Sequence, residues 1–215
     1  MRFSGVCLAT AMLWATAAHA NNLVNNGGFE TGNNTGFSSD YTYVANGNTN
    51  NGACYPEGVI AVVNQANNCH NLWSAVTPHS GDWFLVANGA GSSTDAVWSE
   101  TISVTSGAKY DFSAWGTSLY PVSPANLQFD VNGSSVGTLQ LGSTPGVWQS
   151  FSDAFTAGAG SVTLTIYDLD TDANGNDFGL DDISLSPAVP EPGTLALFGM
   201  ALLALGGLGL RRKSA

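Results

Sequence analysis

The fold of this chain is decided by residues 126–141, which read NLQFDVNGSSVGTLQL. Apolar side chains at Leu127 and Phe129 alternate with polar ones, which is the period of a strand with one buried face. The Asn132-Gly133 dipeptide that follows favours a tight two-residue turn, so the chain is expected to return at once as an antiparallel partner. A β-hairpin is therefore predicted near the middle of the chain.

The same period of two extends to both sides of this hairpin. Further alternating strands are predicted over residues 97–104, 110–115, 147–155, 162–166 and 183–185. Gly, Pro, Asn and Ser separate these segments, and no helical stripe of convincing length lies between them. The pattern predicts an all-β fold, an antiparallel β-sandwich of the jelly-roll type.

Residues 21–80 are less regular and rich in Asn and Gly, with an extreme run at Asn46–Gly52. Such a composition forms loops and is not expected to build core. A short strand is predicted at residues 23–24, followed by a long loop and by strands near 59–63 and 83–87.

The charge of the chain excludes one large class of partners. The chain has 215 residues, enough for one domain plus targeting segments. Between Asn21 and Val189 it holds one basic residue, Lys109, against fifteen carboxylates, which gives a formal charge of −14. Such a domain does not bind nucleic acid by neutralising phosphates or an anionic membrane by charge. Divalent cations and neutral polymers remain as ligand classes.

Residues 1–20 have the features of a secretory signal peptide. Arg2 supplies a positive start, Gly5–Ala18 is apolar, and Ala18-His19-Ala20 has the small residues that signal peptidase accepts. An uncleaved anchor helix is the alternative, but the run is too short to span a bilayer. Cleavage after Ala20 and export are expected.

The C-terminal end combines three features in a fixed order. An extended Pro190-Glu191-Pro192 segment precedes the uncharged residues 193–210, and a basic tail follows, formed by Arg211, Arg212 and Lys213. Eighteen uncharged residues at 1.5 Å each give about 27 Å, which is sufficient for a transmembrane helix. The basic tail is expected to stay cytoplasmic and to leave the rest of the chain outside. A plain anchor explains the helix and the tail but not the Pro-Glu-Pro.

Residues 189–213 resemble the PEP-CTERM sorting signal in all three parts. The resemblance implies processing by exosortase, a membrane cysteine transpeptidase of bacteria that also make exopolysaccharide. It implies a transient anchor in the inner membrane, followed by transfer to the cell surface or extracellular matrix of a Gram-negative bacterium. The chain is thus divided into a signal peptide (1–20), a jelly-roll domain (21–186) and a sorting signal (187–215).

Two cysteines remain in the mature chain, because Cys7 leaves with the signal peptide. Cys54 and Cys69 are expected to form a structural disulfide, since exported chains commonly pair their cysteines. A zinc or redox site that uses the adjacent His70 is the weaker alternative, because no metal-site spacing surrounds it.

The domain resembles the jelly rolls of the carbohydrate-binding, galactose-binding-like class. The resemblance is carried by the segments Asn22–Gly32, Ile102–Phe112 and Phe178–Leu185. It points to a fold more than to a function, because one fold hosts many uses.

In that family a structural Ca²⁺ often ties the first strand to the last, and the matching ligands here are Glu30 and Asp181. Both residues supply the hard oxygens that Ca²⁺ prefers. Strand alternation places Asp181 in phase with the inward Ile183 and Leu185, where an unpaired carboxylate is costly unless a cation compensates it. The alternative is that Asp181 lies at a strand end and accepts backbone N–H bonds.

A second Ca²⁺ interpretation overlaps the first. From Asp170 to Asp181 the chain has the oxygen spacing of an EF-hand-type loop, with Asp172 at the third position, a glycine at the sixth and a nearby Asp177. Strands rather than helices are expected to flank it. A solvated acidic hairpin loop is the alternative and the favoured interpretation, because polar turns often produce this spacing.

Glycan contact is predicted on one exposed face of the strands. An aromatic platform flanked by hydrogen-bonding groups suits a neutral sugar ring. The residues predicted to share this face are Trp115, Asp111, Gln128, Asp130 and Tyr167. Trp73, Tyr55 and Trp83 are weaker candidates on or near loops. In the alternative, the long N-terminal loop covers the face and Trp115 packs beneath it.

Catalysis has little support in the sequence. The mature chain keeps only His70 and His79 and has no Gly-x-Ser-x-Gly motif. Asp111 and Asp130 are the one glycosidase-like pair, although outward acids on strands are more often solvated surface. The expected function is that of a non-enzymatic exported protein that binds glycan or associates with exopolysaccharide. A polysaccharide-active enzyme and a purely structural surface protein are the alternatives.

Overall fold

The computed structural model describes residues 21–172 and 174–188, and Asn21–Ala188 form one compact unit. The predicted signal peptide, the Pro-Glu-Pro motif, the transmembrane helix 193–210 and the basic tail all lie outside the described residues. Within the described ranges, no helix is both long and apolar enough to cross a membrane.

Strands make up nearly all the regular structure of this unit. In chain order the elements are β1 (Thr42–Tyr43), β2 (Val59–Val63), the 3-10 helix η1 (Ala66–Asn68), β3 (Phe84–Asn88), β4 (Ala96–Ser103), β5 (Lys109–Ser118), β6 (Asn126–Val131), β7 (Ser134–Gln140), β8 (Gln149–Thr156), β9 (Ser161–Asp168) and β10 (Phe178–Pro187).

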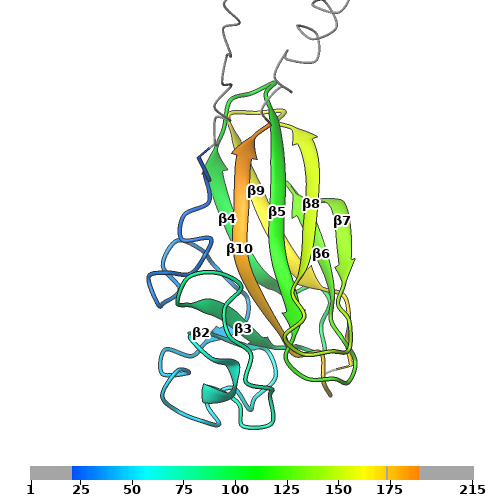
Figure 1. The fold of residues 1–215 in the computed structure, drawn as a ribbon. Coiled ribbons are helices and arrows are strands. Elements are labelled where there is room, and N and C mark those ends of the chain that lie inside the picture. Colours follow the sequence, from blue (N-terminus) through cyan, green and yellow to red (C-terminus); the bar gives the residue numbers. More distant parts are fainter. Residues whose placement is uncertain (1–20, 173, 189–215) are drawn as a thin grey trace, which may run out of the picture. The chain divides into compact units, whose positions relative to one another are not determined.

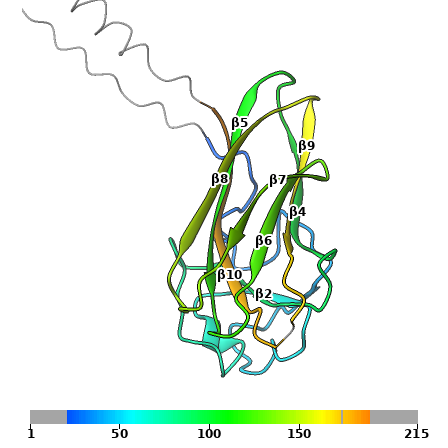
Figure 2. The same cartoon turned by 90° about the vertical axis from the view of Figure 1, so that its right-hand side faces the viewer.

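The strands form two sheets that pack face to face (Figures 1 and 2). One sheet has the order β1-β2-β3-β10-β5-β8 and the other the order β4-β9-β6-β7. All pairs are antiparallel except β1 with β2. The predicted antiparallel β-sandwich is therefore confirmed. The predicted hairpin is β6–β7, and Asn132 and Gly133 at its tip both have positive φ (52° and 75°), as a tight turn of this kind requires.

The main core lies between the two sheets and is rich in aromatic rings. Phe129 of β6 stacks on Phe151 of β8, with ring centroids 3.8 Å apart and planes within 3°. Phe112 of β5 meets Phe129 edge-on at 5.6 Å. Because β6 belongs to one sheet and β5 and β8 to the other, these contacts join the two layers.

A second, smaller core lies on the other side of β2 and β3, under the loops of residues 44–80. Alternate residues of β2 and β3 face this second core, including Ala61 and Val86, while Ile60 and Leu85 face the first. The expectation that the Asn- and Gly-rich segment builds no core is wrong. This segment contributes Trp73, Val76 and the disulfide between Cys54 and Cys69, and these few apolar groups suffice to bury the outer side of both strands.

The first segment of the unit is tied to the last strand without forming a strand of its own. The strand predicted at residues 23–24 is absent, and this prediction is wrong. Leu23 N–H donates to the carbonyl of Leu185, while the side-chain amide of Asn22 donates to Ile183 O and accepts from Leu185 N–H. Because a side chain supplies part of the pairing, a regular backbone ladder does not form.

A β-bulge interrupts β10 between Asp181 and Ser184, where Asp182 has a positive φ of 48°. Leu180 and Ile183 both face the main core although they are three residues apart. Asp181 instead pairs with Trp115 and lies with it on the outer side of the sheet. The prediction that Asp181 shares the inward face of Ile183 is therefore wrong, because the extra residue of the bulge shifts the alternation.

We expect the loss of the Cys54–Cys69 disulfide to lower the free energy of unfolding by about 3 kcal/mol, the value typical of such a short loop. The two cysteines are 15 residues apart, and both are fully buried in the second core. Urea unfolding of the 21–188 unit, with and without reductant, measures the effect. The double variant Cys54→Ser/Cys69→Ser is the control, because reductant should leave it unchanged. An unchanged midpoint on reduction of the wild type would contradict the expectation.

Candidate functional site

Two hollows lie among the loops at the same end of the sandwich. The first has a volume of about 190 Å³ and is called the end pocket below. Its lining residues are Tyr55, Glu57, His70, Leu72, Asn88, Tyr120, Asn174, Gly175 and Asp177.

The end pocket is built where three neighbouring strands of the six-stranded sheet end. Asn88 is the last residue of β3, Asp177 directly precedes β10, and Tyr120 follows β5 by two residues. The register of β10 with β3 and β5 brings these three chain ends together, and Leu119 N–H donates to the carbonyl of Asp177 at 2.9 Å. Gly175 approaches the carbonyl of Val122 with a φ of 114°, and a side chain there would collide with that backbone.

The disulfide positions the aromatic side of the pocket. Tyr55 and His70 each directly follow one of its cysteines, and their ring centroids lie 4.6 Å apart. His70 also stacks on the buried Trp73, at 5.0 Å and 17°. Asn88 fixes the Tyr55 segment, because its side-chain amide donates to the carbonyls of Cys54 and Tyr55 at 2.8 and 3.3 Å.

The electrostatics of the end pocket are dominated by Asp177. Burial raises the pKa of Asp177 to about 6, the nearby Trp73 side chain lowers it in part, and the negative charge of Glu57 raises it further. Trp73 Nε1 and Asp177 Oδ1 are both buried and make no hydrogen bond of good geometry, although their proximity affects that pKa. Burial also lowers the pKa of His70, which disfavours the charged form of this ring.

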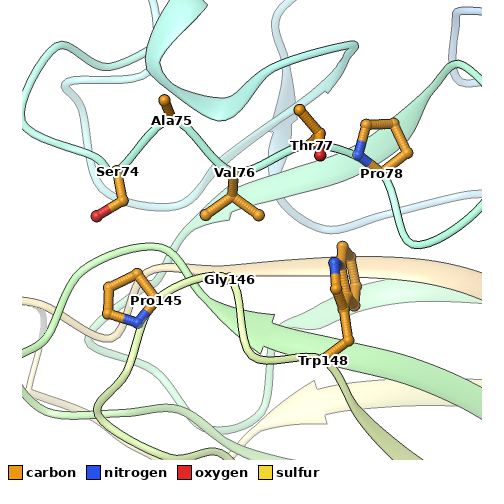
Figure 3. A pocket seen from close by; sticks show the side chains of 8 residues that line it. All are labelled: Ser74, Ala75, Val76, Thr77, Pro78, Pro145, Gly146 and Trp148. Atoms are coloured by element: carbon orange, nitrogen blue, oxygen red, sulfur yellow. The ribbon is translucent and has the colours of Figure 1, made fainter.

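The second hollow, called the tryptophan groove, runs between the segment Ser74–Pro78 and the turn that holds Pro145, Gly146 and Trp148 (Figure 3). Its volume is about 300 Å³. The indole of Trp148 extends from one side toward Thr77 and Pro78 on the other (Figure 3). This groove has no charged lining residue, which distinguishes it from the end pocket.

The exposed large apolar side chains of the described unit gather at these hollows. Tyr55 (49 % exposed) and Leu72 (67 %) line the end pocket, and Val122 (44 %) lies against its Gly175. Val147 (54 %) lies between two lining residues of the tryptophan groove. Exposed apolar groups that cluster beside hollows are typical of binding surfaces.

Glu30 and Asp181, predicted to bind Ca²⁺, act here as hydrogen-bond acceptors for one loop. Asp181 Oδ2 accepts the N–H groups of His79 and Ser80, and Glu30 accepts the N–H of Asp82. Asp182 adds a 2.7 Å contact to His79 Nδ1. These three carboxylates are called the carboxylate clamp below.

Because Gly81 has no side chain, the carboxylate of Glu30 can approach the loop closely. The φ of Gly81 is +64°, and a Cβ there would collide with the carboxylate of Glu30. As arranged, the clamp oxygens engage hydrogen-bond donors, and the described residues hold no cluster of three or more His, Cys, Asp or Glu side chains suited to a metal ion. This geometry is that of a hydrogen-bonded loop, and Ca²⁺ at this position stays a prediction.

The second Ca²⁺ candidate forms a chain of side-chain turns between β9 and β10. Asp168 Oδ1 accepts the N–H of Asp170, Asp170 Oδ1 accepts that of Asp172, and Asp172 Oδ1 accepts that of Asn174. Strands flank this loop, as predicted. Asp177, which belongs to the same prediction, lies instead in the end pocket.

The residues predicted to form one glycan face are divided between the two sheets. Asp111 and Trp115 are on β5 of the six-stranded sheet. Gln128, Asp130 and Tyr167 are on β6 and β9 of the other, where Gln128 pairs with Tyr167. The prediction that all five share a face is wrong, because strand alternation gives the phase of a strand but not the sheet to which it belongs. Asp130 is also buried, with 5 % exposed.

Trp115 is covered on one side by the loop that the clamp holds. The ring of His79 stacks on Trp115 with centroids 3.9 Å apart and planes at 17°, and Trp148 meets His79 edge-on at 5.7 Å. The covering residue, His79, belongs to the segment between β2 and β3 and not to the long N-terminal loop of the alternative. Glycan contact at Trp115 stays a prediction.

Sequence reasoning missed most of the end pocket. Tyr55 was a weak candidate, whereas Glu57, Asn88 and Tyr120 were not singled out. The one available signal was the placement of Tyr55 and His70 directly after the two cysteines of the expected disulfide. Strand order brings Asn88, Tyr120 and Asp177 together, and the alternation of apolar and polar residues does not predict strand order.

Comparison with protein families finds the PEP-CTERM protein-sorting motif at residues 188–213. The chain thus carries the sorting signal that its C-terminal pattern resembled. Comparison with curated proteins finds no match.

Solved structures similar to this chain include carbohydrate-binding modules. The CBM22-1 xylan-binding domain of Paenibacillus barcinonensis Xyn10C is 16 % identical with a TM-score of 0.51, and the match covers 81 % of this chain and 99 % of that one. TmCBM61 in complex with beta-1,4-galactotriose is 16 % identical with a TM-score of 0.50, covering 78 % and 99 %. A CBM22 tandem of the same Xyn10C matches at 19 % identity and TM-score 0.50, with 83 % of this chain covering 49 % of it. These likenesses show a shared jelly-roll fold.

We expect the unit to be more stable at pH 5 than at pH 8. Burial raises the pKa of Asp168 and of Asp181 to about 7, and that of Asp177 to about 6. The folded state then holds these protons more tightly than the unfolded chain, so their stabilising effect is complete below about pH 4 and is lost as the pH rises through 7.

Thermal melts in calcium-free buffer at the two pH values measure this effect, and the melting temperature should be several degrees higher at pH 5. Asp168→Asn should narrow the difference, because it removes one of the three titrating groups. A higher melting temperature at pH 8 would contradict the expectation.

Proposed function

We propose that this chain is an exported, non-enzymatic glycan-binding protein of the cell surface or extracellular matrix, sorted through its C-terminal motif by an exosortase-type system. The observation that carries the proposal is the end pocket, at which exposed apolar side chains surround hydrogen-bonding groups in a jelly roll of the carbohydrate-binding-module type.

Two solved neighbours of this fold support a sugar ligand. One is described as xylan-binding and the other was determined with a galactotriose. At such low sequence identity, these neighbours show only that the fold is shared. The ligand is therefore inferred from the pocket itself. Tyr55 offers an aromatic ring for the apolar face of a sugar, and Glu57, Asn88 and Asp177 supply groups for its hydroxyls.

The size of the pocket favours a chain end over a long stretch of polymer. Its volume of about 190 Å³ is below the roughly 300–1,000 Å³ of pockets for drug-sized ligands. A single sugar ring at the end of a chain or branch is therefore the unit that we assign to it. Association with exopolysaccharide follows from such binding together with the sorting motif.

The position of the pocket suits a domain tethered by its C-terminus. Asp177 directly precedes β10 and Ala188 directly follows it, so the pocket and the start of the sorting motif are separated by the ten residues of this strand. At about 3.3 Å per residue this is roughly 33 Å. In Figure 1 the arrow of β10 points away from the cyan loops that surround β2 and β3.

We expect Tyr55→Ala to weaken glycan binding at least about tenfold, which is the order for loss of a well-packed aromatic contact. A glycan array on the 21–188 unit identifies the ligand, and calorimetry measures the change. Tyr167→Ala is the matched control, because Tyr167 is half-exposed on the four-stranded sheet. If Tyr167→Ala alone removes binding, the site is on that sheet and the assignment to the end pocket is wrong.

The alternative of a polysaccharide-active enzyme is tested with the same preparation. Asp111 and Asp130, the glycosidase-like pair, belong to different sheets, and Asp130 is buried, which does not favour a shared substrate. We expect no sugar release from the glycans that bind. Release that Asp111→Ala or Asp130→Ala abolishes would overturn the non-enzymatic proposal.

We also propose structural Ca²⁺ at the carboxylate clamp. Three carboxylates around one loop provide the ligand chemistry that Ca²⁺ prefers, and a bound cation would offset the burial of Asp181, which is fully buried. EDTA should then lower the melting temperature, and Glu30→Ala should remove this sensitivity. A melting temperature that EDTA leaves unchanged would show that hydrogen bonds alone hold the loop.

A further inference from the structure

We propose that the end pocket selects a positively charged sugar, an amino sugar whose ammonium group pairs with the carboxylate of Asp177. The inference rests on the proposed glycan-binding function and names the ligand class of the same site.

The first observation is that the carboxylate of Asp177 is buried, with the indole N–H of Trp73 beside it as a donor of poor geometry. Asp177 is 7 % exposed, and no described residue donates a well-formed hydrogen bond to its Oδ1. Its Oδ1 is fully buried beside the indole of Trp73, whose N–H is itself unpaired. Asp177 nevertheless lines the pocket. Buried polar groups of folded proteins are rarely left in this state.

The second observation is that no positive charge faces this carboxylate. Glu57 lines the same pocket and adds a second negative charge. His70 is the one titratable nitrogen in the lining, and its Nδ1 accepts the N–H of Leu72 while burial lowers its pKa. Lys109, the single basic residue of the 21–188 unit, begins β5, whereas Tyr120 lies beyond the other end of that strand.

These two observations decide between the classes of sugar. A neutral sugar can donate a hydroxyl to Asp177 but leaves its charge uncompensated, which is costly in a buried site. An acidic sugar adds a third negative charge. An ammonium group supplies both the hydrogen-bond donors and the opposite charge, and such charge-assisted bonds are about twice as strong as neutral ones.

The aromatic side of the pocket fits the same ligand. The rings of Tyr55 and Tyr120 line it together with the His70 ring, which packs against Tyr55 at 4.6 Å. An aromatic ring attracts a cation near its face as well as the apolar side of a sugar ring. The limited volume places the charged ring at a chain end.

The test compares glucosamine and N-acetylglucosamine dimers, which differ in the charge on nitrogen, with a uronic acid dimer as the acidic ligand. Calorimetry at pH 7 uses the 21–188 unit, which has its own core and disulfide. We expect the glucosamine dimer to bind at least about tenfold more tightly than the acetylated one, as one charge-assisted hydrogen bond implies. The uronic acid dimer should not bind.

Variants assign the preference to the pocket. Asp177→Asn keeps the shape and should remove the preference for the charged dimer, and Glu57→Gln should reduce it. The control is Asp153→Asn, which removes an exposed acid on β8 and should leave the preference unchanged. An equal loss in Asp153→Asn would mean general attraction to an acidic protein and would overturn the inference.

The remaining outcomes separate the two proposals. If the neutral dimer binds as well as the charged one, the inference fails and the proposed function stands. If no sugar binds, the proposed function fails as well. If Ca²⁺ displaces the glucosamine dimer from the wild type and also binds there without sugar, Asp177 is a metal ligand and the inference is overturned.

Discussion

Strand β10 hydrogen-bonds to β3 along one edge and to β5 along the other, and this double pairing positions the functional features of the domain. The residue before β10 is Asp177, the buried acid of the end pocket. The bulge within β10 turns Asp181 toward the loop of the carboxylate clamp. The later part of β10 receives the side chain of Asn22 and fixes the first segment of the unit. One slip of its register would therefore separate all of these groups.

The disulfide supplies what the strands cannot, namely a fixed position for the aromatic side of the pocket. The loops of residues 44–80, before and after β2, are too polar to fold through burial alone. The Cys54–Cys69 disulfide joins the loop before β2 to the loop after it, and together they cover the outer side of β2 and β3 and bury Trp73. Tyr55 and His70 follow the two cysteines directly and meet at the pocket. Stability of the loops and geometry of the site thus depend on the same covalent bond.

The sequence predicted the fold well because alternation is a local signal. The β6–β7 hairpin follows from Asn132-Gly133, and most strands lie close to their predicted positions. Long-range features were beyond this kind of reasoning. Asp181 faces the outer side of the sheet and not the core, because a period-two pattern does not reveal the extra residue of a bulge. Gln128 and Trp115 lie on different sheets, because alternation does not show to which sheet a strand belongs. The end pocket forms only where the strand order and the disulfide together bring its residues into one place. The sequence therefore predicted only some of its lining residues.

We propose that this domain binds sugar in the end pocket and not on the outer surface of a sheet. The most direct measurement is a chemical-shift titration of the isotope-labelled 21–188 unit with the glycan that binds it. We predict that the largest changes occur at the amides of Tyr55, His70, Tyr120 and Asp177, with small changes elsewhere. Largest changes at Gln128 and Tyr167 on the four-stranded sheet would contradict it.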